Sequence, residues 1–393
     1  MRKKIVTGLI ICLFLISSVY AESGGNLHIG NIKIHPFTSV ETKYNDNIYL
    51  ESKGNENRDL ITTTTLGFDT KTPLVFLRGD PEFDLNYAVG IKDYKENSSQ
   101  DIVEQVLEAN TTYDISTEFY YKIREKYIYT ADPPNLEVIT LEKRYRNILT
   151  QNFGYAKNRI IIDTQYQIIK DHYFSSGYSS LNKTEYIFTP KFSYQIFSKT
   201  FIFTSVDFGD IKYNTNSTNS DSKDYRYNVG LEGQISSKID GLLKFGQEQK
   251  HYDESTKKDF NGLATEINLG YKLSDRTKLN FTGSRFAEES TYANNSYFIS
   301  IGIAIKANHS LNEKLTVTPG VKYSYNKYPE ETTEQSVTKK RRDYVLGFSL
   351  GFMYAIRDWS SVEIGYEYEK RNSNFNKYGY VNNQVFVKFK ILF

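Results

Sequence analysis

The sequence predicts an all-β protein, a transmembrane antiparallel up-and-down β-barrel of about 18 strands with both termini in the periplasm. Three observations lead to this prediction. Apolar and polar residues alternate along many runs of the chain, short polar turns alternate with longer polar loops, and the chain finishes in an alternating strand at Phe393.

The alternation is clearest toward the C-terminus, where one face of a run is apolar throughout: Tyr344, Leu346, Phe348, Leu350, Phe352, Tyr354 and Ile356. Small residues such as Gly347 and Ser349 occupy the opposite face. A period of two residues indicates a β-strand with one apolar face. Runs of roughly 10–14 residues are the length that a strand tilted by about 45° needs to cross a bilayer, and longer than usual in a soluble sandwich.

Turn residues supply the strand count. Short polar connections are expected at 114–116, 157–158, 198–199, 237–240, 274–275, 310–312 and 357–358. Longer polar loops are expected at 51–57, 96–101, 129–141, 175–180, 214–223, 253–258, 288–295, 329–339 and 372–377. With the segment 70–79 as a further turn, the hairpins give about 18 strands, with long loops outside and short turns in the periplasm. Among the loops, 129–141, with Pro133 and Pro134, is the candidate to fold inward.

The N-terminal segment predicts export. Basic residues at Arg2 to Lys4 precede an apolar run and a small-residue end at Ala21, which is typical of a secretory signal peptide. We therefore expect a signal peptide at 1–21, a short periplasmic segment at 22–31 and the barrel at 32–393. The only cysteine, Cys12, lies inside the signal, so the mature chain has no thiol for a disulfide or a metal.

Composition excludes other classes. Mean hydropathy is −0.53, and no later apolar stretch reaches the ~18–20 residues of a membrane helix. The formal charge of +2 gives no reason to expect nucleic acid as a partner. Aromatic residues make up 15 %, mostly Tyr and Phe, which suits strands and interfacial girdles. The last strand alternates from Val385 to Phe393, as expected of a strand that pairs with the first and closes the barrel.

Both ends of the chain carry short motifs: Ile34-His35-Pro36, Tyr44-Asn45-Asp46-Asn47-Ile48-Tyr49 and Arg58-Asp59-Leu60-Ile61, then Arg342-Asp343-Tyr344, Arg357-Asp358-Trp359, Tyr366-Glu367-Tyr368, Arg371-Asn372-Ser373 and Asn382-Asn383. In these motifs, which cover about a third of the chain, the sequence resembles an outer-membrane β-barrel family whose genes often lie in exopolysaccharide or capsule clusters. The resemblance implies an outer-membrane barrel with a part in polysaccharide export, and it carries over no catalytic residues.

Charged residues on the polar phase of the strands are the candidate pore lining: Glu232, Glu266, Lys272, Lys306, Lys322, Glu363, Glu367, Lys388 and Lys390. A charge facing lipid near the bilayer midplane would cost about 2–4 kcal/mol, so these side chains are expected to face water inside the barrel. They either tune selectivity for a polar solute or merely neutralise one another.

Lys339, Lys340, Arg341 and Arg342 form the densest basic run, a candidate outer-rim cluster for lipopolysaccharide phosphate or an acidic glycan, or else an ordinary solvated loop end. The oxygens of Asn45, Asp46 and Asn47 could hold Ca²⁺, but a strand ending in a turn explains them equally.

A hydrolase would need His with Asp or Ser near the outer rim. Asp171-His172 and His251 with Asp253 are the only such groupings, and no complete triad can be placed. We expect no enzyme, cofactor or metal.

The sequence thus favours a passive or export-associated pore in the bacterial outer membrane, for a secreted polysaccharide or another polar solute. The alternatives are a structural or adhesive surface barrel with a blocked lumen, and a general diffusion porin. Expected partners are outer-membrane lipid, lipopolysaccharide, the barrel-assembly machinery and polysaccharide.

Overall fold

A computed structural model describes residues 27–29, 32–73, 81–133, 137, 139–214, 219–292, 294–334 and 336–393. The predicted signal peptide and most of the predicted turn at 70–79 lie outside these residues. None of the helices in the described part of the chain is long and apolar enough to span a membrane.

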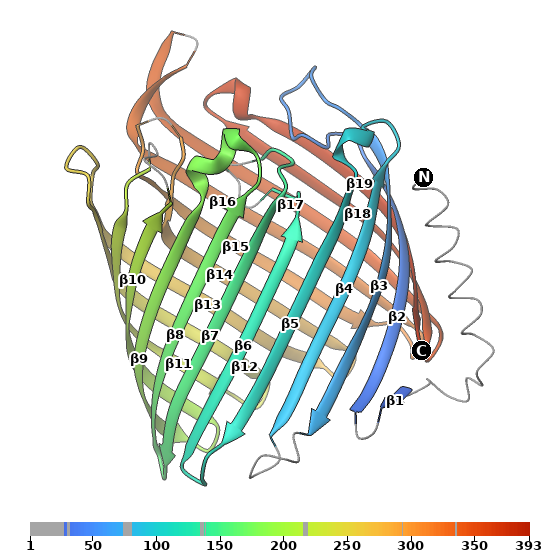
Figure 1. Cartoon of the computed structure of the whole chain (residues 1–393), viewed down its shortest axis with the longest axis vertical. Coiled ribbons are helices and arrows are strands. Elements are labelled where there is room, and N and C mark those ends of the chain that lie inside the picture. The colour runs from blue at the N-terminus through green and yellow to red at the C-terminus, as the bar shows by residue number, and fades with distance from the viewer. Residues whose placement is uncertain are drawn as a thin grey trace.

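Within the described ranges, 18 antiparallel strands, β2 to β19, close into one barrel (Figure 1). Their bounds are β2 (Ile32–Asn45), β3 (Asp59–Pro73), β4 (Glu82–Tyr94), β5 (Ile102–Asp114), β6 (Phe119–Thr130), β7 (Arg144–Lys157), β8 (Ile160–Tyr173), β9 (Lys183–Phe197), β10 (Thr200–Tyr213), β11 (Ser222–Gln234), β12 (Ile239–Tyr252), β13 (Phe260–Ser274), β14 (Thr277–Glu289), β15 (Tyr297–Ser310), β16 (Leu315–Glu334), β17 (Val337–Arg357), β18 (Ser360–Ser373) and β19 (Tyr380–Leu392). The predicted barrel and its strand number are confirmed.

Short additional elements lie outside the barrel wall. β1 (Leu27–Ile29) pairs with the start of β2. Among the described residues, three short 3-10 helices, η1 (Ser98–Gln100), η2 (Ser176–Leu181) and η3 (Asn376–Tyr378), lie in the loops after β4, β8 and β18. All three occur at the end of the barrel that carries the long loops.

The barrel closes between β19 and β2. Their register runs from Gln384 opposite Asn45 to Leu392 opposite Phe37, and the backbone N–H of Phe393 donates to the Pro36 carbonyl at 2.8 Å. This pairing removes the last free sheet edge, which no membrane-spanning sheet can leave exposed. β2 begins and β19 ends at the same end of the barrel as the short turns.

Side-chain burial alternates along the strands as predicted. In β17 the apolar residues from Tyr344 to Ile356 that share one face are each 38–49 % exposed, whereas Arg341, Asp343 and Val345 on the other face are 1–2 % exposed. An outward surface of Phe, Tyr, Ile and Leu suits lipid, and a polar interior suits water.

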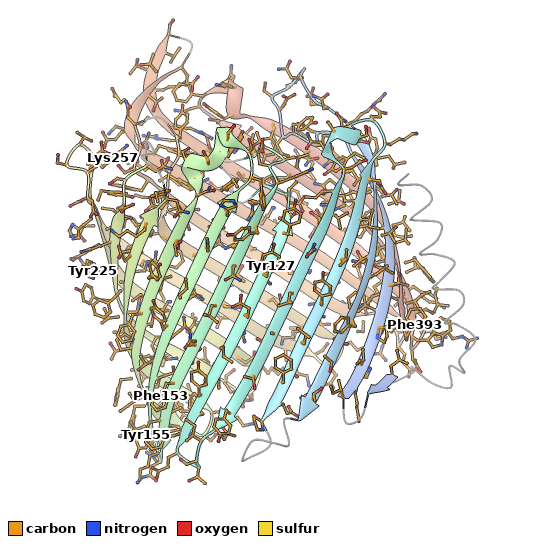
Figure 2. The ribbon with its side chains drawn as sticks, viewed as in Figure 1. Tyr127, Phe153, Tyr155, Tyr225, Lys257 and Phe393 are labelled. Atoms are coloured by element: carbon orange, nitrogen blue, oxygen red, sulfur yellow. The ribbon has the colours of Figure 1, made fainter. Side chains whose placement is uncertain are left out.

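Aromatic side chains gather near both ends of the wall. Phe119 contacts Phe153 and Tyr155 close to the short turns, and Tyr325 stacks on Tyr344 at 4.8 Å toward the long loops. Figure 2 shows Phe153 and Tyr155 near the short-turn end and Tyr225 projecting from the outer wall. Two such girdles are the usual mark of the two membrane interfaces.

One predicted loop is wrong. The segment 329–339 is not an irregular loop, because β16 continues to Glu334 and β17 starts at Val337. After a register shift between Lys327 and Glu331, the two strands pair again up to Glu334 and Val337. They form a hairpin that rises above the rim (orange in Figure 1). The β-branched residues of this segment, Thr332, Thr333, Val337 and Thr338, favour an extended backbone, although the segment is too polar to show an apolar alternation.

Candidate functional site: the outer mouth and the charged lumen

The end of β14 that lies beside the long loops leaves the barrel wall. The ladder between β13 and β14 stops at Thr265 opposite Arg285, while β14 stays paired with β15 as far as Glu289 opposite Tyr297. The backbone N–H of Ala287 donates to Glu248 Oε2 of β12 at 3.0 Å, so the hairpin leans inward past β13. We name residues 286–296 the inner loop; of these, Ala293 lies outside the described residues.

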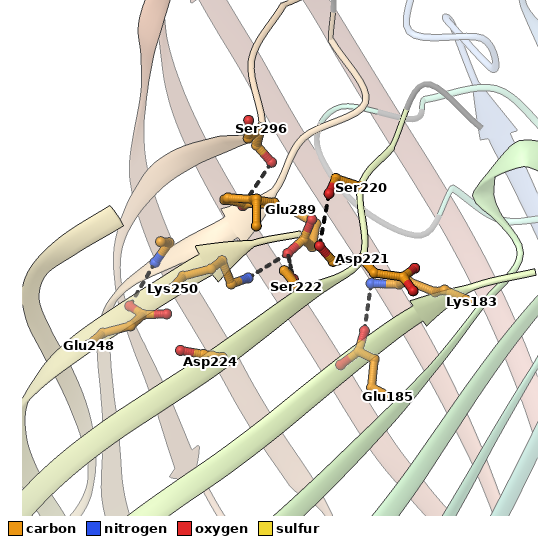
Figure 3. Close-up of polar contacts among 12 residues, drawn as sticks. Lys183, Glu185, Ser220, Asp221, Ser222, Asp224, Glu248, Lys250, Glu289 and Ser296 are labelled. Carbon is orange, nitrogen blue, oxygen red and sulfur yellow. Dashed lines mark hydrogen bonds and ion pairs between the residues drawn. The ribbon is translucent and has the colours of Figure 1, made fainter. Parts of the chain in front are cut away.

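Glu289 anchors the inner loop to one side of the wall. Its carboxylate accepts hydrogen bonds from Lys250 Nζ at 2.7 Å and Ser222 Oγ at 3.0 Å (Figure 3). The Tyr213 hydroxyl of β10 donates to the same carboxylate at 3.4 Å. Lys250 is only 2 % exposed, so its ion pair with Glu289 is buried. Removal of either partner would leave an unpaired buried charge.

Tyr292 anchors the inner loop to β16 and η3. Its ring packs edge-on against Tyr328 of β16 and Tyr378 of η3, with centroids 5.4 and 5.3 Å away. The Arg341 guanidinium lies over all three rings at 3.8–4.8 Å and pairs with Asp343 at 2.6 Å. A desolvated guanidinium on tyrosine faces is a favourable cation–π arrangement. This aromatic cluster therefore holds β16, β17, η3 and the inner loop together.

Glu137 provides a third anchor from across the barrel. It lies in the loop between β6 and β7, and it accepts hydrogen bonds from Ser290 Oγ at 2.7 Å and from the Thr291 backbone N–H at 2.6 Å. The β6–β7 and β14–β15 hairpins stand almost opposite each other in the ring of strands. Glu137 of the 129–141 loop therefore meets the inner loop over the lumen.

The Glu137 carboxyl at this contact is a titratable group whose pKa is affected by burial. Removal of the Glu137 carboxyl from water raises its pKa, although Thr291 and Ser290 donate to it and Arg341 lies near, all of which lower it.

A cavity of about 1000 Å³ lies in the lumen beside the inner loop. Its wall comes from strands β7 to β15, and most of its cations pair with carboxylates of the same wall. Lys191 binds Glu232 at 2.6 Å, Lys244 binds Glu266 at 2.7 Å, and Arg226 binds Asp224 at 2.6 Å. The wall is thus polar and largely self-neutralising, which permits a hydrated path for a polar solute.

The nine candidate lining residues all occupy the inward phase of their strands, but the structure does not gather them into one site. Glu232 and Glu266 line the large cavity, and Lys322 pairs with Glu369 at 2.5 Å beside a smaller one of about 420 Å³. Lys388 lies 4.0 Å from Glu41, Lys390 lies over the Phe37 ring, and Lys272 pairs with Asp275 at the short-turn end. Lys306 lies opposite Gly320, Glu363 opposite Lys388, and Glu367 opposite Gln384.

Comparison with known proteins agrees with this geometry. The family model described as "Putative beta-barrel porin 2" matches residues 20–393. The chain belongs to this porin family. No curated protein matches the chain significantly.

Solved structures show the same fold at low sequence identity. Pseudomonas aeruginosa OccK1 (OpdK) matches with a TM-score of 0.50 and 8 % identity, over 92 % of this chain and 99 % of that one. The siderophore receptor PirA from Pseudomonas aeruginosa matches with a TM-score of 0.48 and 8 % identity, over 92 % of this chain and 80 % of that one. These likenesses concern the fold alone, and the family match makes this chain a porin-family β-barrel.

The terminal motifs meet at the closure of this porin barrel. Asp46 accepts from the backbone N–H and the side-chain amide of Asn383 at 2.7 and 2.6 Å, and Asn47 donates to the Val381 carbonyl at 3.0 Å. The Asn45–Asn47 oxygens are thus engaged in a turn that fastens β2 to β19. Among the described residues no group of His, Cys, Asp and Glu could hold a metal ion.

The basic run does not form one exposed cluster. Arg341 is 1 % exposed inside the aromatic cluster, and Lys339 lies over the Phe375 ring at 4.8 Å. Lys340 and Arg342 point outward, because neighbouring residues of a strand face opposite sides. Arg342 lies directly opposite Lys327 of β16.

The histidine groupings are separated in the same way. His172 stacks on Tyr145 and meets Phe174 edge-on, whereas Asp171 faces inward and binds Arg146 at 3.0 Å. His251 bonds to Asp259 at 2.8 Å rather than to Asp253. The two pairs expected from the sequence, Asp171 with His172 and His251 with Asp253, are therefore not formed.

Proposed function

We propose that this porin-family barrel is a passive outer-membrane pore for a polar solute, with an aperture set by the inner loop. The observation that carries the proposal is the combination of a charge-lined lumen and a loop bridge across its outer mouth. Barrels of 16–18 strands are wide enough to enclose an aqueous channel. The paired charges of the wall need water, and an apolar plug would leave them poorly solvated.

The more specific form of the proposal is export of a secreted polysaccharide. Two features support it: the likeness of the terminal motifs to a family associated with polysaccharide gene clusters, and a cavity wall in which amides and hydroxyls such as Gln165, Gln167 and Thr189 stand between the ion pairs. Such groups can hydrogen-bond sugar hydroxyls in a chain that moves past them. Glycosyltransferase genes beside this gene would favour export, and their absence would weaken it.

The same bridge also favours a rival, a surface barrel with a blocked lumen whose loops bind a partner. The inner loop is held by contacts on three sides, and a loop held in this way would obstruct the lumen. A general diffusion porin lies between the two, since it conducts without a preferred solute. Conductance separates these alternatives.

The test uses purified full-length protein in planar bilayers. Replacing residues 290–296 with a short Gly-Ser linker should raise single-channel conductance several-fold. The linker removes the contacts of Ser290 and Thr291 with Glu137 and of Tyr292 with Tyr328. A matched control replaces residues 254–257, a loop of similar polarity outside the bridge, and should leave conductance unchanged. Changing Lys388 and Lys390 to Glu should shift selectivity toward cations. Folded protein that inserts yet conducts in neither form would leave the blocked barrel as the better account.

Orientation and lipid contacts belong to the same proposal. We place the long loops outside the cell and the short turns, with the start of β2 and the end of β19, in the periplasm. Lys327, Lys340 and Arg342 would then lie on the outer wall beyond the Tyr325–Tyr344 stack, where lipopolysaccharide carries its phosphates. No ion pair joins these three cations to a carboxylate in the described part of the chain.

A further inference from the structure

Arg144 differs from the other cations of the large cavity. It is the outermost residue of β7, it lines the cavity, and it is 8 % exposed. Its Nε and Nη1 nevertheless make no hydrogen bond. Buried polar groups in native proteins are almost always satisfied, and an unsatisfied guanidinium is a costly exception that calls for a partner.

The adjacent carboxylate does not supply that partner. Asp171 of β8 receives both of its close contacts from Arg146, at 3.3 and 3.0 Å. Arg144 Nη1 lies 4.0 Å from the nearer Asp171 oxygen, which is too long for a hydrogen bond. Arg144 and Arg146 therefore lie on the same face of β7 beside one carboxylate, that of Asp171. Only Arg146 is hydrogen-bonded to it.

The flanking charges do not restore the balance. On one side Lys183 is bound to Glu185 at 2.5 Å (Figure 3). On the other, Glu104 of β5 is bound by Lys92 at 2.9 Å and by the Thr130 hydroxyl. In the cluster of Arg144, Arg146, Lys183, Asp171 and Glu185, three cations face two carboxylates. Within this cluster, Nε and Nη1 of Arg144 are buried donor nitrogens without a hydrogen-bond partner.

We propose that Arg144 forms the centre of an anion-binding site in the lumen, which takes a carboxylate group carried by the solute. Guanidinium donors bind carboxylates through charge-assisted hydrogen bonds, and this geometry suits them better than a lysine ammonium. A cavity of about 1000 Å³ holds a small acidic sugar or one residue of an acidic glycan. This assignment rests on the proposed pore function, since it names the chemistry of the solute.

Isothermal titration of the folded full-length protein in detergent micelles tests the site. D-glucuronate is the probe, and glucose, which lacks the carboxylate, is its uncharged analogue. We expect glucuronate to bind and glucose not to bind. Arg144→Gln should weaken glucuronate affinity at least tenfold, and Arg58→Gln, which removes an exposed arginine of the loop between β2 and β3 at the same end of the barrel, should leave it unchanged. Equal affinity in wild type and Arg144→Gln, or an equal loss in Arg58→Gln, overturns the site.

A second variant of Arg144 and a second anion complete the experiment. Arg144→Lys keeps the charge while removing the Nε donor, so its affinity should lie between wild type and Arg144→Gln; it also serves if Arg144→Gln fails to show the heat-modifiable migration of a folded barrel. Sulfate that binds as well as glucuronate identifies a site for oxyanions in general, and weaker sulfate binding identifies a carboxylate site. Binding without conductance keeps the site and rejects the pore, whereas conductance without binding rejects the site alone.

Discussion

Glu137 and Thr291 meet across the outer mouth of the barrel: the Glu137 carboxylate accepts the Thr291 backbone N–H at 2.6 Å, although the two residues are 154 positions apart. This contact joins two loops from nearly opposite sides of the strand ring. It ties one side of the inner loop to a titratable group, the Glu137 carboxyl.

Acidification should therefore tighten the bridge. Because burial raises the pKa of Glu137 in the docked loop, docking binds a proton, so its stabilisation is present at low pH and is lost as pH rises through that raised pKa. Single-channel conductance should increase from acid to neutral pH in the wild type. Glu137→Gln, which resembles the protonated group, should remove this increase. Identical pH profiles in the two proteins would contradict the assignment.

Lys250→Met should destabilise the barrel by about 3–5 kcal/mol, because it leaves the buried Glu289 carboxylate without its cation. Lys272→Met is the matched control: the side chains of Lys272 and Asp275 are 61 % and 94 % exposed, so its loss should cost about 0–1 kcal/mol. Denaturant unfolding followed by the fluorescence of Trp359 measures both changes. Similar stabilities for the two variants would show that Glu289 does not depend on Lys250.

Deleting Phe393, or changing it to Asp, should lower the amount of folded barrel in the outer membrane. Deletion removes the backbone donor to the Pro36 carbonyl at the closure, and Asp places a charge where an apolar ring ends the last strand. Heat-modifiable migration on gels reports the folded fraction. Wild-type levels in both variants would mean that closure does not need this residue.

A single cysteine at Ser336 should react with a membrane-impermeant maleimide on intact cells, because Ser336 lies at the tip of the β16–β17 hairpin. A cysteine at Asn158, in the short turn after β7, should not react. Both residues have positive φ, so the two substitutions are matched in backbone strain. The corresponding site at Ser217 lies outside the described residues. Labelling at Asn158 alone would invert the orientation.

Changing Lys340 and Arg342 to Gln should reduce the lipopolysaccharide that copurifies with the barrel, by about fivefold for each cation, since a basic residue near an anionic surface contributes about 1 kcal/mol. Lys199→Gln with Arg357→Gln, at the short-turn end, is the control and should have no effect. Lipid phosphate per mole of protein is the measurement. An equal reduction in both double variants would remove the assignment to the outer rim.

The sequence by itself determined the wall of this barrel. A two-residue period is a local property, so Tyr344 to Ile356 could be placed on the outside, and the inward phase of Glu363 and Lys388 assigned, without knowledge of any partner strand. Alternating short turns and long loops then gave the strand number. The same local rule also separates Arg341 from Arg342, and its application to the basic run would have shown that the run divides between two faces.

Only the tertiary structure decided what happens at the outer mouth. The inner loop reads as one more polar loop, and nothing local indicates that β14 leaves β13 at Arg285 or that Glu137 contacts Ser290. The unsatisfied guanidinium of Arg144 likewise emerges only from the contacts, because Arg146 rather than Arg144 is hydrogen-bonded to Asp171. Contacts between loops depend on the closure of the barrel, which brings distant residues together, so their pairing follows from packing and burial rather than from any periodicity along the chain.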